Sequence, residues 1–203
     1  DGISLIQTAE GALNEAHSIL QRMNELATQA ANDTNTSSDR SAVQDELNAL
    51  TSEIDRIAST TQFNTQNLLD GNFTGKNLQV GALEGQKISL TIATMDAAAL
   101  SIDAIKVSTF TDAGSAMTQI QHAISSVSKQ RSALGAVQNR LEHTVANLDN
   151  VSENTSSAES RIRDTDMAEE MVNYSKNNIL AQAGQSMLAQ ANQSTQGVLS
   201  LLQ

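Results

Sequence analysis

The sequence predicts a mainly α fold: an elongated antiparallel helical bundle or coiled-coil rod with a small β-hairpin insert. Three observations lead to this prediction. Apolar residues follow a 3.5-residue repeat over long stretches of the chain. Proline is absent, so no residue interrupts a helix by removing an N–H donor. Aromatic residues make up only 2% of the 203 residues, so the core must use small and aliphatic side chains, which let helices approach closely.

The first predicted helix runs from about Ser4 to Ala31 and carries one unbroken apolar seam. The seam residues alternate in steps of three and four: Ile6, Ala9, Leu13, Ala16, Leu20, Met23, Ala27 and Ala30. Such a repeat keeps one face of a helix turned toward a partner helix. We therefore expect this helix to lie lengthwise along others.

A second helix is expected after the polar segment from Asn32 to Ser38, whose short side chains compete for backbone hydrogen bonds. Ser38 or Asp39 is expected to cap it, and it runs to about Ser59. Its seam is Val43, Leu47, Leu50, Ile54 and Ile57. Two helices that carry seams and are joined in this way are expected to fold back on each other.

A small β insert is predicted between residues 65 and 110. Four of the ten glycines mark turns there: Gly71, Gly75, Gly81 and Gly85. Ile88, Leu90 and Ile92 alternate with polar residues, which is typical of a half-buried strand. Leu78 and Val80 are expected to belong to its hairpin partner.

A third helix is predicted from about Asp112. Its seam recurs every seven residues, at Ile120, Val127, Leu134, Leu141 and Leu148, with a second row at Ile124, Val137, Val145 and Val151. Arg131 stands among these rows. We expect its aliphatic stem to lie along the seam with the charged head in water.

A last helix is predicted after the polar segment from Asn154 to Ser157. Its apolar face is formed by Leu180, Ala183, Met187, Leu188, Ala191, Val198 and Leu202. No partner for this face is evident in the chain. An apolar stripe of this length would favour aggregation if left exposed, so we expect it to bind something.

Composition and charge exclude several classes of function. The net charge is −11, from 23 acidic and 12 basic residues, which argues against nucleic acid as a partner. No run of 18 apolar residues occurs, and the polar helix faces are acidic or neutral, so neither a membrane span nor a membrane-surface helix is expected.

The absence of cysteine excludes disulfides and thiol chemistry. The first residues lack the features of a signal peptide, and the pattern starts without a helix cap, which suggests a piece of a longer protein.

No arrangement of residues indicates catalysis, a metal site or a cofactor. His17, His122 and His143 show no metal-ligand spacing. Adjacent carboxylates such as Glu169 and Glu170 are expected on exposed helix faces, and no phosphate-binding loop or nucleophile motif is present. The sequence therefore predicts a protein that assembles and not an enzyme.

Five segments resemble bacterial flagellin. Residues 1–13 are similar to the helix near the start of the family's core, and Thr61–Asn64 to the turn before its variable insert. Residues 133–141 and 158–168 resemble the two signatures of the carboxy-terminal half, and residues 187–192 resemble its end. The resemblance covers nearly all of the chain outside 72–110. Within the family, the sequence is most similar to flagellins from Bacillus-like Gram-positive bacteria.

The resemblance implies four segments. Residues 1–64 would supply the N-terminal core (D1) helices, 65–110 the short hairpin or variable insert, 111–155 the C-terminal core helix, and 156–203 the terminal (D0) helix. It also implies a structural subunit of the extracellular flagellar filament, secreted and self-assembling by helix packing for motility. The alternative is another coiled-coil secretion-system or hook–filament junction protein.

Two further partners are implied by the resemblance. A flagellar export chaperone would bind the C-terminal helix at Ile179, Leu180, Met187, Leu188, Val198 and Leu199. Toll-like receptor 5 would bind at Arg22, Leu26, Glu46, Gln21 and Gln29. Asn24 and Leu50 depart from the family pattern, because a basic residue and an arginine are common at these two positions.

Overall fold

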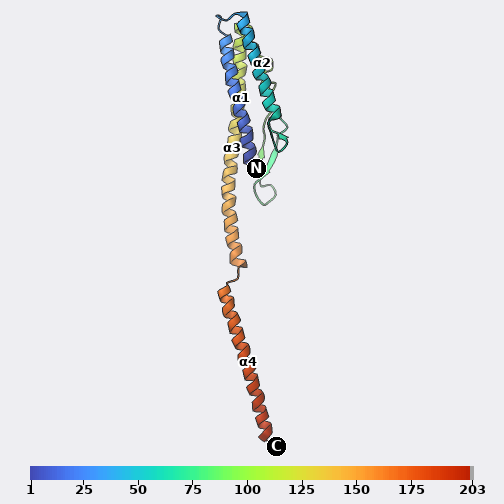
Figure 1. The fold of residues 1–203 in the computed structure, drawn as a ribbon, viewed down its shortest axis with the longest axis vertical. Coiled ribbons are helices and arrows are strands. Elements are labelled where there is room, and N and C mark those ends of the chain that lie inside the picture. Colours follow the sequence, from blue (N-terminus) through green and yellow to red (C-terminus); the bar gives the residue numbers. More distant parts are fainter. Residues whose placement is uncertain (202–203) are drawn as a thin grey trace. The chain divides into compact units, whose positions relative to one another are not determined.

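The computed structural model describes residues 1–201, and side-chain environments through Ser194. Its elements in chain order are α1 (Gly2–Ala30), α2 (Ser37–Thr60), β1 (Gln62–Phe63), β2 (Gln66–Asn67), β3 (Lys76–Gln79), β4 (Lys87–Leu90), α3 (Phe110–Arg163) and α4 (Met167–Leu201). The chain divides into two compact units, Asp1–Asp149 and Asn150–Gln203. In the first unit, α1, α2 and the first part of α3 lie side by side (Figure 1). The fold is mainly helical, as the sequence predicts.

The apolar seam of α1 is buried along its whole length. All eight predicted seam residues are at most 2% exposed: Ile6, Ala9, Leu13, Ala16, Leu20, Met23, Ala27 and Ala30. Four of them are alanine, which suits closely packed helices. The predicted register of this helix is therefore confirmed.

α2 returns antiparallel to α1 after a short turn and buries Val43, Leu47 and Ile54 against it. The prediction of its cap was wrong: the N-cap is Thr36, whose side chain accepts from the Asp39 backbone N–H. Asp39 instead occupies the third helical position, where its carboxylate accepts from the Thr36 backbone N–H at 2.9 Å. The two residues form a capping box, which satisfies two backbone donors at once.

α3 runs antiparallel to α1 in the first unit. Gly2 near the start of α1 faces Leu141, because a Cβ at Gly2 would lie 3.4 Å from the Leu141 Cδ1. At the other end, the Thr28 hydroxyl donates to the Met117 sulfur at 3.4 Å. The predicted seam residues are buried from Ile120 to Leu141. Beyond that point α1 has ended, and Val145, Leu148 and Val151 are 40–52% exposed.

The head of Arg131 is only partly exposed to water, and it is paired with a carboxylate. Its Nε donates to the Glu10 Oε1 of α1 at 2.7 Å, and the two side chains are 30% and 35% exposed. The sequence pattern carried no sign of the acidic partner, which is 121 residues away along the chain.

The predicted hairpin is present. β3 and β4 pair antiparallel with Leu78 opposite Ile88, and Ile88 and Leu90 are buried. Ile92 lies just past β4, is fully buried, and donates its N–H to the Phe73 carbonyl at 2.9 Å. A second, shorter hairpin joins β1 and β2 through Asn64 and Thr65, both of which have positive φ.

A long irregular connection from Thr91 to Thr109 joins β4 to α3, and side chains of α2 hold it in place. The Gln44 amide donates to the Ile105 carbonyl at 3.0 Å and accepts from the Val107 N–H at 2.9 Å. The Asp55 carboxylate accepts from the Ala97 N–H at 2.8 Å. These bonds satisfy backbone groups that have no strand or helix partner.

α3 does not end at the predicted polar segment. It continues through Asn154 and Ser157 to Arg163, because polar residues only weakly disfavour an exposed helix and no proline intervenes. The break falls at residues 164–166, where the Asp166 carboxylate accepts from the Ala168 N–H at 2.9 Å and caps α4.

We expect the substitution Leu20→Ala to destabilise the first unit by about 2–5 kcal/mol, because Leu20 is fully buried in the middle of the α1 seam. Leu83→Ala is the matched control, since Leu83 is 67% exposed and its truncation should change stability by less than about 0.5 kcal/mol. Chemical denaturation measures both. Equal effects of the two substitutions would contradict the burial of the seam.

We expect Thr65→Gly to stabilise the protein by about 0.5–1 kcal/mol. Thr65 has φ of 62°, a left-handed conformation that is unfavourable for a β-branched residue and free of strain for glycine. Thr74→Gly serves as the control, because Thr74 is exposed in the same insert without a positive φ and should only lose stability. Thermal unfolding distinguishes the two signs.

Candidate recognition surfaces

An exposed ion pair joins α1 and α2 where the sequence predicts a receptor-binding face. The Arg22 Nε and Nη2 donate to the Glu46 Oε1 at 3.1 and 2.9 Å, and Nη1 donates to the Glu25 Oε2 at 3.3 Å. The side chains of Arg22 and Glu46 are 50% and 45% exposed. The fold therefore brings together two residues that lie 24 positions apart in the sequence.

The electrostatics of this pair favour the ionised state. Hydrogen bonds from Arg22 to Glu46, and then to Glu25, raise the pKa of the guanidinium above its ordinary value. The pair is open to solvent, where an ion pair contributes little to folding stability. A charged group that stability does not require is free to serve recognition.

The other predicted residues divide between surface and core. Gln21 and Gln29 are exposed on α1, and the Gln21 amide lies 3.1 Å from the His17 Nε2. Leu26 is only 1% exposed and belongs to the hydrophobic core. Its position four residues after Arg22 places it on the same side of α1.

The two positions that depart from the family pattern are both partly buried. Asn24 has its Oδ1 buried without a hydrogen-bond partner. Leu50 packs against the core from α2. Neither residue extends the exposed charged surface around Arg22.

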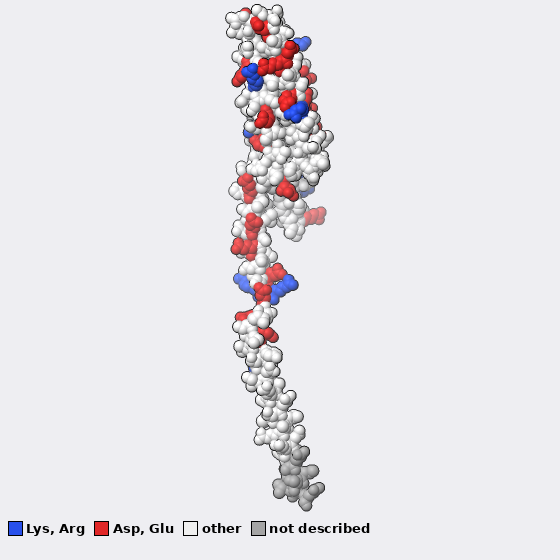
Figure 2. Space-filling model, viewed as in Figure 1, with Lys and Arg blue, Asp and Glu red and all other residues white. Residues whose placement is uncertain are grey.

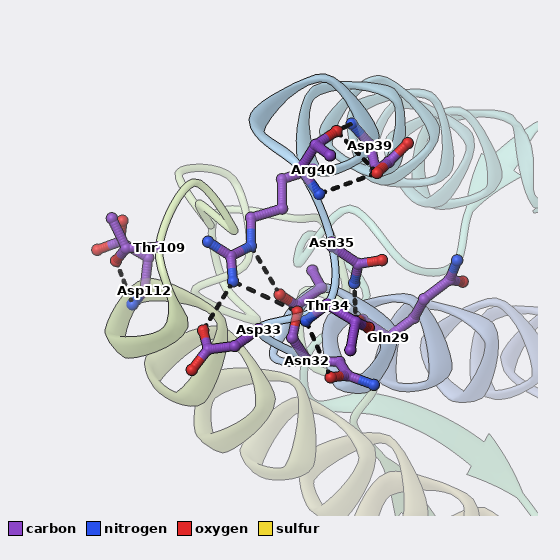
Figure 3. Close-up of polar contacts among 11 residues, drawn as sticks. Gln29, Asn32, Asp33, Thr34, Asn35, Asp39, Arg40, Thr109 and Asp112 are labelled. Carbon is purple, nitrogen blue, oxygen red and sulfur yellow. Dashed lines mark hydrogen bonds and ion pairs between the residues drawn. The ribbon is translucent and has the colours of Figure 1, made fainter.

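A polar cluster fastens the turn between α1 and α2 (Figure 3). The Arg40 Nε donates to the Ala30 carbonyl at 3.0 Å, and its Nη2 contacts the Asn32 carbonyl and the Asp33 carboxylate. The Arg40 side chain is 15% exposed. A cation bonded to the last carbonyls of a helix satisfies their lone pairs and complements the helix dipole. Arg40 therefore fixes how α2 leaves α1.

α4 presents the predicted unpartnered apolar face. Every described side chain of this helix, through Ser194, is exposed. Ile179, Leu180, Met187 and Leu188 are 58–68% exposed. The side chains of Val198 and Leu199 lie outside the described residues. Figure 2 shows few charged atoms on the described part of α4, where only Glu169, Glu170 and Lys176 carry charge.

The described part of the chain contains no arrangement suited to catalysis or metal binding. No group of three or more potential ligands lies close enough to hold a metal ion among the described residues. Asp55, Asp70, Asp96 and Asp103 line one surface hollow in the first unit without forming such a group. No described helix is long and apolar enough to cross a membrane.

Family comparisons match both ends of the chain. Residues 1–74 match the bacterial flagellin N-terminal helical region, and residues 117–202 match the bacterial flagellin C-terminal helical region. A flagellin of Halalkalibacterium halodurans is 56% identical over 204 residues, which cover all of this chain and 75% of that protein. The chain belongs to the bacterial flagellin family.

Other flagellins agree in sequence and in fold. A flagellin of Bacillus subtilis is 49% identical over all of this chain and 78% of its own length. The crystal structure of Bacillus cereus flagellin superposes with a TM-score of 0.67 at 30% identity, covering 78% of this chain and 92% of that one. The predicted likeness to flagellins of Bacillus-like bacteria is confirmed.

As a flagellin, the chain is a structural subunit of the flagellar filament, which is extracellular and serves motility. It is not an enzyme, and it associates with other copies of its kind. A filament requires contacts between unlike surfaces of neighbouring copies, which do not close into a ring. The alternative of another coiled-coil secretion-system protein is set aside, because matches to flagellin span both helical regions.

Sequence reasoning missed the Arg40 cluster and the Glu10–Arg131 pair. Arg40 follows a polar segment that indicates only a turn. Two of its three acceptors are backbone carbonyls, which a sequence does not reveal, and the third is the Asp33 carboxylate. Arg131 did carry a signal, because a charged residue interrupts two apolar rows.

We expect the capping box at Thr36 and Asp39 to contribute stability that disappears in acid. Hydrogen bonds from the Thr36 side chain and backbone lower the pKa of Asp39 below its ordinary value. A lowered folded-state pKa means that the contribution is present above about pH 4 and is lost as pH falls through the folded-state value.

Asp39→Asn should therefore lower the melting temperature at pH 7, and the difference from the wild type should shrink as the pH falls toward 2. Thermal unfolding at both pH values measures this. Asp45→Asn, which removes an exposed carboxylate from the same helix and leaves the capping box intact, is the control. A difference that stays constant down to pH 2 would contradict the assignment.

Proposed function

We propose that the exposed face around Arg22 and Glu46 binds Toll-like receptor 5, in addition to the filament role. The observation that carries this proposal is the ion pair across α1 and α2, with the Arg22 side chain half exposed and with Gln21 and Gln29 also exposed on α1. Arginine is enriched among residues that dominate binding energy, because its planar fork donates several hydrogen bonds at once.

The pair also presents Arg22 in a defined position. Two of its nitrogens bond Glu46 on α2, and a third bonds Glu25 on α1. Holding the side chain in one geometry lowers the entropy cost of binding. A receptor carboxylate or carbonyl can then accept from the remaining guanidinium protons.

Leu26 takes an indirect part in this proposal. Because it is 1% exposed, it supports the surface from the core and keeps α1 against its neighbours. Truncation of Leu26 would then weaken recognition together with stability, whereas truncation of Arg22 or Glu46 would weaken recognition alone.

A receptor reporter assay tests the proposal. The double variant Arg22→Ala/Glu46→Ala should lose at least about tenfold in potency, which corresponds to about 1.4 kcal/mol of binding free energy. The matched control is Arg56→Ala/Glu53→Ala, which removes another exposed ion pair from α2. Equal potency of wild type and the Arg22/Glu46 variant would refute the assignment, as would equal losses in both double variants.

We further propose that α4 binds a flagellar export chaperone before assembly. The support is its exposed apolar face, including Ile179, Leu180, Met187 and Leu188, with the predicted continuation at Val198 and Leu199. Amphipathic helices commonly bind in hydrophobic grooves through residues spaced three and four apart. The division into segments 1–64, 65–110, 111–155 and 156–203 belongs to the same proposal, with the last segment as the chaperone-binding one.

Titration calorimetry with a purified flagellar export chaperone tests this second proposal. Leu180→Asp/Met187→Asp should weaken binding at least about tenfold, because it places charge on the apolar face. Asn178→Asp/Gln182→Asp adds the same charge on the opposite side of α4 and should bind like the wild type. Unchanged binding by the first variant would exclude this face as the binding site.

A further inference from the structure

The outward face of α3 in the first unit is positively charged, although the whole chain carries a net charge of −11. From Ala113 to Leu141 the helix contains no acidic residue. Two cations of this stretch, Lys129 and Arg140, are exposed, and neither forms an ion pair among the described residues. The third cation, Arg131, is paired with Glu10. α3 therefore presents positive charge that its own copy does not neutralise.

The two unpaired cations lie on one side of α3. Lys129 and Arg140 are eleven positions apart, which is close to three complete helical turns, so their side chains point in nearly the same direction. Most exposed residues between them are small or short, including Ser132, Ala133 and Ala136. Small side chains allow another helix to approach closely. We call this surface, with its two cations, the basic face of α3.

A second surface of the first unit carries carboxylates without a cation. Asp45 of α2 and Asp103 of the irregular connection are exposed, and neither forms an ion pair among the described residues. Asp103 lines a surface hollow together with Asp55 and Asp96, whose carboxylates accept from backbone N–H groups of the connection. The arginine that lines the hollow is paired with Glu53. We call the four aspartates the acidic face of α2.

The charges on the two faces are spaced alike. Lys129 and Arg140 are separated by about 17 Å along α3, and Asp45 and Asp55 by about 15 Å along α2, at 1.5 Å per helical residue. Both helices run antiparallel to α1, so they point in the same direction (Figure 1). In two copies that also point in the same direction, Lys129 can lie opposite Asp45 while Arg140 lies opposite the hollow.

We propose that the basic face of α3 in one copy binds the acidic face of α2 in a neighbouring copy of this chain. The occupant is a second copy because the two faces are complementary in charge and in spacing, and because the chain is a filament subunit. The inference rests on that filament role and not on the receptor or chaperone proposals.

The contact joins two unlike faces, which has a consequence for assembly. Each copy in a row keeps one face of each kind for its next neighbour, so the contact continues without closing into a dimer. Exposed ion pairs add little affinity, but complementary charge selects the partner surface and its register, and like charges placed opposite each other are strongly unfavourable. Reversal of charge on one face should therefore impair assembly much more than neutralisation.

Charge reversal tests the contact in filaments of the flagellin as its bacterium secretes it. Lys129→Glu/Arg140→Glu should raise the critical concentration for assembly at least about tenfold, because carboxylates then face carboxylates. Asp45→Lys/Asp103→Lys should raise it as well, although it shifts the net charge in the opposite direction. The variant that combines all four substitutions exchanges the charges and should restore wild-type assembly. Sedimentation of filaments measures the critical concentration.

Lys76→Glu/Lys87→Glu is the matched control. It reverses two exposed cations of the β3–β4 hairpin and changes the net charge as much as the α3 variant does, so it should assemble like the wild type. Wild-type assembly of either reversed variant would overturn the proposal. Failure of the combined variant to recover, or an equal loss in the control, would overturn it too.

Thermal unfolding of the unassembled variants completes the design. All four reversed side chains are exposed, so each variant should melt at the wild-type temperature. A lowered melting temperature in the reversed variants would assign these charges to the folding of a single copy and would contradict a contact between copies.

Discussion

Burial of the α1 seam between α2 and α3 is the interaction on which the rest of the first unit depends. Its residues are almost completely removed from water, from Ile6 to Ala30. Burying each large aliphatic side chain contributes roughly 1.5–3 kcal/mol, and the alanines between them allow the helices to approach closely. Because the seam occupies one continuous face, it determines where α2 folds back and where α3 can lie. The hairpins and the irregular connection then cover what these helices leave exposed, with Gln44 and Asp55 bonding their backbone groups.

The two units differ in whether their aliphatic side chains are buried or exposed. The first unit buries its aliphatic residues and displays ion pairs such as Arg22–Glu46 on α1 and α2. The described part of α4 displays its aliphatic residues and carries few charges. An exposed apolar helix favours aggregation of an isolated monomer, but it allows a subunit to bury that surface against other chains. This contrast fits a flagellin, whose stable form is the filament.

Periodicity was sufficient to predict the α1 seam, the α3 seam from Ile120 to Leu141, the buried α2 positions Val43, Leu47 and Ile54, and the β3–β4 hairpin, because burial imposes a spacing that the sequence displays. It did not predict that Val145, Leu148 and Val151 of α3 are exposed. Features that depend on partners distant in the chain were not predictable in this way. The head of Arg131 was expected in water, whereas Glu10 binds it from another helix. The helix expected to end near Asn154 continues to Arg163, since polar residues weaken an exposed helix without stopping it. Of the receptor-face residues, Arg22 and Glu46 are joined at the surface, while Leu26 lies in the core, which a motif alone does not reveal.

Native-state hydrogen exchange on the unassembled subunit tests the central claim most directly. If the α1 seam holds the first unit together, the amides of Leu13 and Leu20 should exchange only through global unfolding and share one opening free energy. The amides of α4 between Ile179 and Leu188 should exchange much faster, through local opening of an exposed helix. Equal protection of α1 and α4, or fast exchange at Leu13 and Leu20, would contradict the account.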